Sequence, residues 1–112
     1  MKKTQALDAL AALGQETRLD IFRRLIREFP NAMPAGDLAR TLAVPQSTLS
    51  AHLTILSHAG LIASNRQGRT ILYSADADGV RDLLGFLIND CCRGQPQICA
   101  QLVAAASPAC CP

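Results

Sequence analysis

The feature that most constrains the fold is a pair of short amphipathic segments separated by a tight turn. Residues 35–43 (AGDLARTLA) and 46–59 each place apolar side chains at helical spacing, and the tripeptide VPQ turns the chain between them. Gly60 then stops the second segment. Two short helices joined in this way predict a helix-turn-helix.

The pattern changes directly after the second helix. Residues 61–66 and 69–75 are rich in β-forming side chains and are joined by the dipeptide QG, which predicts a β-hairpin. A hairpin in this place converts a helix-turn-helix into a winged helix. We therefore expect a mainly α fold with one small β-hairpin.

The rest of the chain is predicted to form three longer helices and a C-terminal extension. Residues 4–13, 15–29 and 76–92 have helical periodicity, and 96–106 could add a short final helix. We expect these residues to form the apolar faces of the three longer helices: Leu7, Leu10, Ala11 and Leu13; Leu19, Phe22, Leu25, Ile26 and Phe29; Val80, Leu83, Leu84, Leu87 and Ile88. A chain of 112 residues forms one folded domain, which we place at 1–92 with a cysteine-containing extension at 93–112.

The second helix of the pair has a face suited to a nucleic acid. Leu49, Leu53 and Leu56 must point into the core, which leaves small and hydrogen-bonding side chains elsewhere on the helix. Hydroxyls and helix N-terminal amides bind phosphate, and Gln and His reach base edges. The DNA-contacting candidates on this helix are Gln46, Ser47, Thr48, Ser50, His52 and Thr54.

The hairpin tip supplies positive charge. Arg66 and Arg69 flank the tip sequence RQGR, where their side chains are free to reach phosphates or a minor groove. The polar helix face alone could be an ordinary solvated surface. Two arginines beside a helix that carries no carboxylate favour DNA binding instead, although the net charge of +2 is small.

Three stretches resemble the ArsR/SmtB family of metal-responsive winged-helix repressors. They are LGQETRLDIFRRL (13–25), DLARTLAVPQSTLSAHLTILSHAGLI (37–62) and the wing with RTILYSA (69–75). The resemblance implies a homodimer built from the first and the last long helices. It also implies that 46–59 is the recognition helix, that the operator is palindromic, and that metal or metalloid binding releases the DNA.

Two metal sites known in that family have no counterpart in this sequence. The stretch MPAGDLARTLA, before the recognition helix, has no cysteine, although many arsenic-responsive members carry Cys-x-Cys there. The helix at 76–92 has no histidine, although zinc-responsive members often use Asp and His ligands along it. We assign neither histidine to a metal. His52 lies where the family presents a polar residue to DNA, and His58 lies at a helix C-terminus, where a cation interacts favourably with the helix dipole.

All five cysteines lie at or beyond residue 91, which suits a ligand site better than isolated buried thiols. Cys91 and Cys92 are adjacent, and Cys99 can fold back over them because Gly94 and Pro96 allow a bend. Adjacent helical side chains diverge by about 100°, so the helix must end or unwind there. Three soft thiolates suit trigonal As(III), with Sb(III) as a second candidate. We predict an inducer site at Cys91, Cys92 and Cys99.

Several alternatives stay open. Cys110 or Cys111 could add a fourth ligand, which would suit zinc or cadmium. Oxidation of the same thiols could be the signal, with a disulfide from Cys99 to Cys91 or Cys92. A metal carrier without a DNA role is disfavoured by the wing, and an arsenate reductase is disfavoured because no oxyanion loop surrounds the thiols.

Other classes are disfavoured by what the sequence lacks. There is no Ser/His/Asp set, carboxylate pair or phosphate-binding glycine loop, so we expect no enzyme activity and no organic cofactor. Asp8 interrupts the N-terminal Ala/Leu run, which argues against a secretory signal, and no apolar run of membrane-spanning length is present. We expect a cytoplasmic protein with reduced thiols and no membrane partner. The sequence leaves the operator and the choice between arsenite, methylated arsenite and antimonite open.

Overall fold

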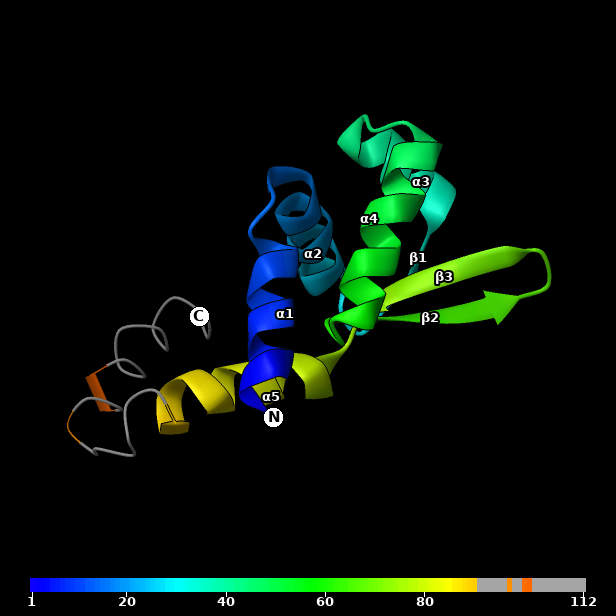
Figure 1. Cartoon of the computed structure of the whole chain (residues 1–112). Helices are drawn as coiled ribbons and strands as arrows, with labels where there is room; N and C mark the ends of the chain where they lie inside the picture. The colour runs from blue at the N-terminus through cyan, green and yellow to red at the C-terminus, as the bar shows by residue number, and fades with distance from the viewer. Residues whose placement is uncertain (91–96, 98–99, 102–112) are drawn as a thin grey trace.

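The structure, a computed structural model, describes residues 1–90, Gln97, Ala100 and Gln101. Its elements in order are α1 (Lys3–Leu13), α2 (Glu16–Glu28), β1 (Met33–Pro34), α3 (Ala35–Leu42), α4 (Gln46–His58), β2 (Ile62–Gln67), β3 (Thr70–Ala75), α5 (Ala77–Gly85) and a π-helical turn η1 (Phe86–Asp90). Figure 1 shows the β2–β3 hairpin extending away from the helices as a wing. The winged helix-turn-helix fold expected from the sequence is confirmed.

The first four expected helices agree with the structure to within one residue at each end. The helix expected at 76–92 differs, because regular α-helix ends at Gly85 and a π-helical turn follows over Phe86–Asp90. A π-helical turn is wider than an α-helical one, because its backbone hydrogen bonds join residues five positions apart in place of four. A segment of five residues is about one turn, which is too short for its own periodicity to be recognised in the sequence.

The sheet has three strands in the order β1-β3-β2, all antiparallel. β1 was not expected from the sequence. It has only two residues, and its pairing of Met33 with Tyr73 and Pro34 with Leu72 depends on a strand 38 or more positions away. Pro34 lacks a backbone N–H, so it suits the edge of the sheet. This pairing ties the start of α3 to the base of the wing.

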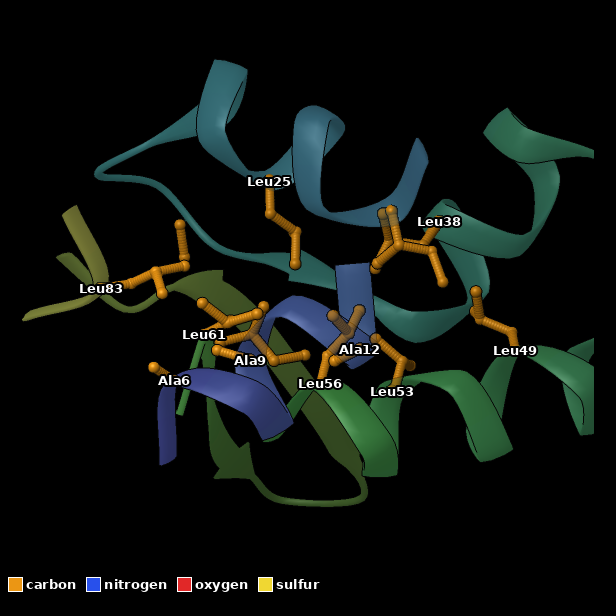
Figure 2. Packing of buried hydrophobic residues seen from close by; sticks show 13 residues of the cluster. Ala6, Ala9, Ala12, Leu25, Leu38, Leu49, Leu53, Leu56, Leu61 and Leu83 are labelled. Atoms are coloured by element: carbon orange, nitrogen blue, oxygen red, sulfur yellow. The ribbon is translucent and has the colours of Figure 1, made fainter. Parts of the chain in front are cut away.

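The hydrophobic core collects side chains from all five helices and from the strand ends (Figure 2). The fully buried large residues are Ile21, Leu25, Leu38, Leu49, Leu53, Leu56 and Leu61. The three leucines expected to point inward from α4 are therefore confirmed as core residues. They hold α4 against α1, α2 and α3 at once.

On α1 the structure corrects the expected face. The buried side chains are Ala6, Ala9 and Ala12, whereas Leu7 and Leu10 are 55% and 43% exposed. Small alanines allow α1 to approach its neighbours closely, and larger leucines in the same positions would hold it away. The larger apolar residues of α1 consequently lie on the surface of the single chain.

A similar correction applies to α2, where Ile21 was not among the expected core residues. Ile21 and Leu25 are fully buried and Phe22 is half-buried. The other three residues of the expected face are exposed: Leu19, Ile26 and Phe29. The buried face of α2 is therefore centred on Ile21 and Leu25, and it is rotated around the helix axis from the face that the apolar pattern predicted.

The start of α5 packs against the turn between α4 and β2. The Asp76 carboxylate accepts a hydrogen bond from the Gly79 amide at 3.1 Å and so caps the helix. The Asp76 amide donates to the Leu61 carbonyl at 3.0 Å. The backbones come so close here that a Cβ on Gly79 would lie 1.7 Å from the Gly60 carbonyl oxygen. This contact sets how α5 leaves the DNA-reading half of the fold.

Candidate nucleic-acid interface

The turn between α3 and α4 is fixed by local backbone geometry. Ala43 adopts φ 54°, in the left-handed region, and ends α3. The Val44 amide then donates to the Ala39 carbonyl at 3.0 Å, which closes the helix end. Pro45 follows as the residue before α4, where its missing N–H costs nothing. The turn therefore presents the first residues of α4 at the end of the motif.

The first turn of α4 is open to an anion. No side chain caps this helix end and no acidic residue lies in its first turn. Its unpaired backbone amides and the positive end of the helix dipole both favour a phosphate. The predicted contact residues Gln46, Ser47, Thr48 and Ser50 are all exposed here.

Two of the predicted contact residues on α4 have partners within the protein. The Thr54 hydroxyl donates to the Ser50 carbonyl at 3.0 Å, although Thr54 remains exposed. His52 is half-buried, and its Nδ1 lies 3.3 Å from an Nη1 of Arg18 on α2. His52 is thus held against α2, unlike the freely exposed residues of the first turn.

The wing is a two-residue hairpin whose register differs by one position from the expected one. The strands end at Gln67 and Thr70, so the turn residues are Gly68 and Arg69. Gly68 has φ 64°, and a positive φ at the first turn residue is the reason that glycine is favoured there. Arg69 therefore lies in the turn itself, at the tip of the wing.

Arg66 stands on β2, paired across the hairpin with Ile71. Its Nε is 3.4 Å from the Gly68 carbonyl, and the side chain is exposed. Both wing arginines are accordingly available at the solvent side of the hairpin tip.

A groove of about 450 Å³ brings α4 and the wing together. Its lining comes from the end of β1, the start of α3, the start of α4 and the hairpin: Pro34, Ala35, Gly36, Gln46, Ser50, Arg69, Thr70, Ile71 and Tyr73. Three predicted contact residues, Gln46 and Ser50 of α4 and the more distant Arg69 of the wing, thus share one surface. Ser47, Thr48, His52, Thr54 and Arg66 are not among the lining residues.

Thr70 and Tyr73 are polar lining residues that sequence reasoning missed. Both lie on β3, and Tyr73 is paired with Ser64 across the hairpin and with Met33 of β1. Strand alternation could not have marked both, because residues three positions apart on a strand point to opposite faces, and only the assembled groove brings them together. Their hydroxyls add hydrogen-bonding groups to the wing side of the groove.

The electrostatics of this surface suit a polyanion. Between Leu38 and Ala75 the sequence contains no Asp or Glu, whereas it contains Arg40, Arg66 and Arg69. Asp37, just before this stretch, forms an ion pair with Arg40. The helix-turn-helix therefore presents no unpaired carboxylate to an approaching phosphate backbone.

The predicted thiol site lies outside the described residues, since Cys91, Cys92 and Cys99 are not among them. Within residues 1–90, Gln97, Ala100 and Gln101, no group of three His, Cys, Asp or Glu side chains could hold a metal ion. In the same part of the chain no helix is long and apolar enough to cross a membrane.

The fold and this surface define a winged helix-turn-helix DNA-binding regulator. A family model described as a helix-turn-helix domain matches residues 13–65. The chain is 37% identical to the nodulation protein NolR of Rhizobium meliloti over 78 residues, which is 70% of this chain and 62% of NolR. It thus spans less than two thirds of that relative. It is 30% identical to the transcriptional activator HlyU of Vibrio cholerae over 83 residues, 74% of each chain.

Among solved structures, an ArsR-like transcriptional regulator from Rhodococcus sp. RHA1 aligns with a TM-score of 0.71 and 26% identity, covering 92% of this chain and 93% of that one. The protein belongs to the ArsR/SmtB family of winged-helix transcriptional regulators.

Proposed function

We propose that the chain is a metalloid-responsive repressor that binds a palindromic operator as a homodimer and leaves it when As(III) binds. The observation that carries the DNA-binding part is the groove in which Gln46 and Ser50 of α4 face Arg69 of the wing. A duplex seated there would meet helix amides, hydroxyls and a guanidinium at once. Regulation of this kind requires binding and no catalysis. Because the operator is in the cytoplasm, we propose the same location for the protein.

The homodimer is supported by apolar side chains that the single chain leaves uncovered. Leu7 and Leu10 of α1 and Leu84 of α5 are each exposed by more than two fifths. Leu84 also lines an open hollow of about 430 Å³ together with Ile26 and Phe29 of α2. A two-fold partner that covers these residues would remove them from water and would set two recognition helices about 34–36 Å apart.

The inducer part rests on the sequence of the thiols and on the shape of the helix before them. Cys91, Cys92 and Cys99 offer three soft ligands, which suit As(III) or Sb(III). The described chain leaves regular α-helix at Gly85 and passes through a π-helical turn that ends at Asp90. Adjacent thiols can face one ligand only where regular α-helical geometry is lost, and the described chain already departs from that geometry over Phe86–Asp90.

The first test is a titration of the reduced protein with arsenite on its own upstream DNA, followed by fluorescence anisotropy. The wild-type protein should bind the DNA and release it near one arsenite per site. Cys91→Ser, Cys92→Ser and Cys99→Ser should each bind DNA and ignore arsenite. Truncation after Ala106, which removes the last two cysteines, is the matched control and should respond normally.

A loss of response in the truncated chain, with a normal response in Cys99→Ser, would move the site to Cys110 and Cys111. Release by zinc or cadmium but not by arsenite would support the four-ligand alternative.

The second candidate signal is oxidation of the same thiols. It is favoured by the likeness, at 30% identity and a TM-score of 0.61, to a structure described as reduced HlyU from Vibrio cholerae. Here oxidant alone should release the DNA and a reductant should restore binding. If arsenite is the signal, oxidant is not needed, and arsenite should release the DNA even in the presence of a monothiol reductant.

A further inference from the structure

Arg18 joins three parts of the fold. Its Nε donates to the Ala12 carbonyl in the last turn of α1 at 2.7 Å. Its backbone amide donates at 2.8 Å to the side chain of Gln15, the residue before α2. Its Nη1 lies 3.3 Å from Nδ1 of His52 on the recognition helix α4. One side chain thus connects the end of α1 with the middle of α4.

The chemistry of this contact determines the state of the His52 ring. A guanidinium has donors only, so Nδ1 must accept, and the ring hydrogen of His52 therefore lies on Nε2. His52 is half-buried, and Nδ1 is the ring nitrogen that lies next to Arg18.

Arginine is suited to this position in a way that lysine is not. The planar guanidinium directs Nε and Nη1 along different lines, so one side chain reaches the Ala12 carbonyl and the His52 ring together. The Ala12 carbonyl belongs to the last turn of α1, where carbonyls have no partner within the helix, so the bond also caps α1. A lysine ammonium on a flexible stem would satisfy one of the two partners at a time.

We propose that Arg18 is a positioning residue that sets the orientation of α4 relative to α1 through Nδ1 of His52. This rests on the proposed function, because α1 carries the exposed Leu7 and Leu10 of the proposed dimer interface. In a two-fold dimer the spacing of the two recognition helices depends on how each α4 is held against its α1. Arg18 thereby contributes to the choice of operator and makes no phosphate contact.

The first experiment uses two replacements of His52, each of which keeps a polar group near a different nitrogen of the ring. Asparagine places its amide oxygen near the position of Nδ1, and glutamine places its amide near Nε2. We expect His52→Asn to keep operator affinity within about threefold, whereas His52→Gln loses about tenfold, a factor equal to roughly 1.4 kcal/mol. The reverse order would mean that His52 contacts the DNA directly, and the proposal would be wrong.

The second experiment separates positioning from phosphate binding. Arg18→Lys and Arg18→Met should each lower operator affinity by about tenfold but leave binding to random DNA and the salt dependence unchanged. A phosphate contact would instead lower the slope of log K against log salt by about one unit and weaken all sequences alike. Arg23→Met, which removes an exposed arginine from the same helix, is the charge-matched control and should keep operator preference.

A third measurement needs no DNA, so it separates this proposal from the proposed function. Nitrogen-15 NMR of the free protein at neutral pH should show the His52 ring with its hydrogen on Nε2, and in Arg18→Lys a mixture of both ring forms. A hydrogen on Nδ1 in the wild-type protein would overturn the proposal even if operator binding is normal. If the wild-type protein has the expected ring form but shows no operator preference, the proposed function fails and the Arg18–His52 contact stands. Arg18→Lys serves where Arg18→Met does not fold.

Discussion

Replacing Gly79 with alanine should test how α5 is attached to the DNA-reading half of the protein. The new Cβ would lie 1.7 Å from the Gly60 carbonyl oxygen and 2.9 Å from its carbon, whereas Cβ atoms keep at least 3.0 Å. The obstruction is backbone, so no side chain can rotate away. Either α5 or the turn at Gly60 must move by more than 1 Å.

The magnitude follows from two opposing effects. Overpacking of this kind costs about 3 kcal/mol when backbone must shift. Alanine in a helix recovers about 0.5–1 kcal/mol relative to glycine. The net loss in the free energy of unfolding should therefore be about 2 kcal/mol, equivalent to a fall in Tm of roughly 8 °C for a domain near this size.

Gly36→Ala is the matched control, because it changes the same residue type near the start of another helix. Its Cβ would meet only the end of the Arg40 side chain, at 3.7 Å, and its backbone needs no positive φ. This variant should be more stable than the wild type by about 0.4–1 kcal/mol. Thermal and urea unfolding followed by circular dichroism measures both. A Gly79→Ala protein with the wild-type Tm, or a higher one, would refute the close approach of α5 to the turn.

Four further outcomes are expected. Arg66→Ala combined with Arg69→Ala should weaken binding to all DNA sequences and lower the slope of log K against log salt by up to about two units; an unchanged slope would contradict the assignment of the wing. Leu7→Asp should convert the proposed dimer to a folded monomer in analytical ultracentrifugation, because it puts a charge inside the proposed interface. An unchanged sedimentation coefficient would exclude α1 from that interface. Asp76→Ala should cost about 1 kcal/mol of unfolding free energy through the lost cap on Gly79, measured by urea denaturation against Asp76→Asn, which keeps an acceptor. Leu53→Ala should cost about 2–5 kcal/mol by the same assay, because Leu53 is fully buried; a loss below 1 kcal/mol would place it outside the core.

The local patterns that determine the winged helix can be read from the sequence alone. The spacing of Leu49, Leu53 and Leu56 predicts the inward face of α4, and all three are buried, whereas Ile55, the other large apolar residue of that helix, is 43% exposed. The hairpin is equally local, since β-forming runs on either side of a glycine have few other ways to pair. The turn lies at Gly68 and Arg69, one residue later than the QG turn that the sequence predicts. Either pair can form a two-residue turn, and only the pairing of Gln67 with Thr70 selects between them.

The surfaces depend on tertiary structure. On α1 two apolar stripes compete, one of alanines and one of leucines, and hydrophobicity alone favours the leucines. The alanines are buried because α1 lies too close to its neighbours for larger side chains, and that closeness is a property of the assembled helices. The partner of His52 was hidden for a similar reason. Arg18 is 34 residues away in sequence, and only the packing of α2 against α4 brings its guanidinium to the imidazole ring.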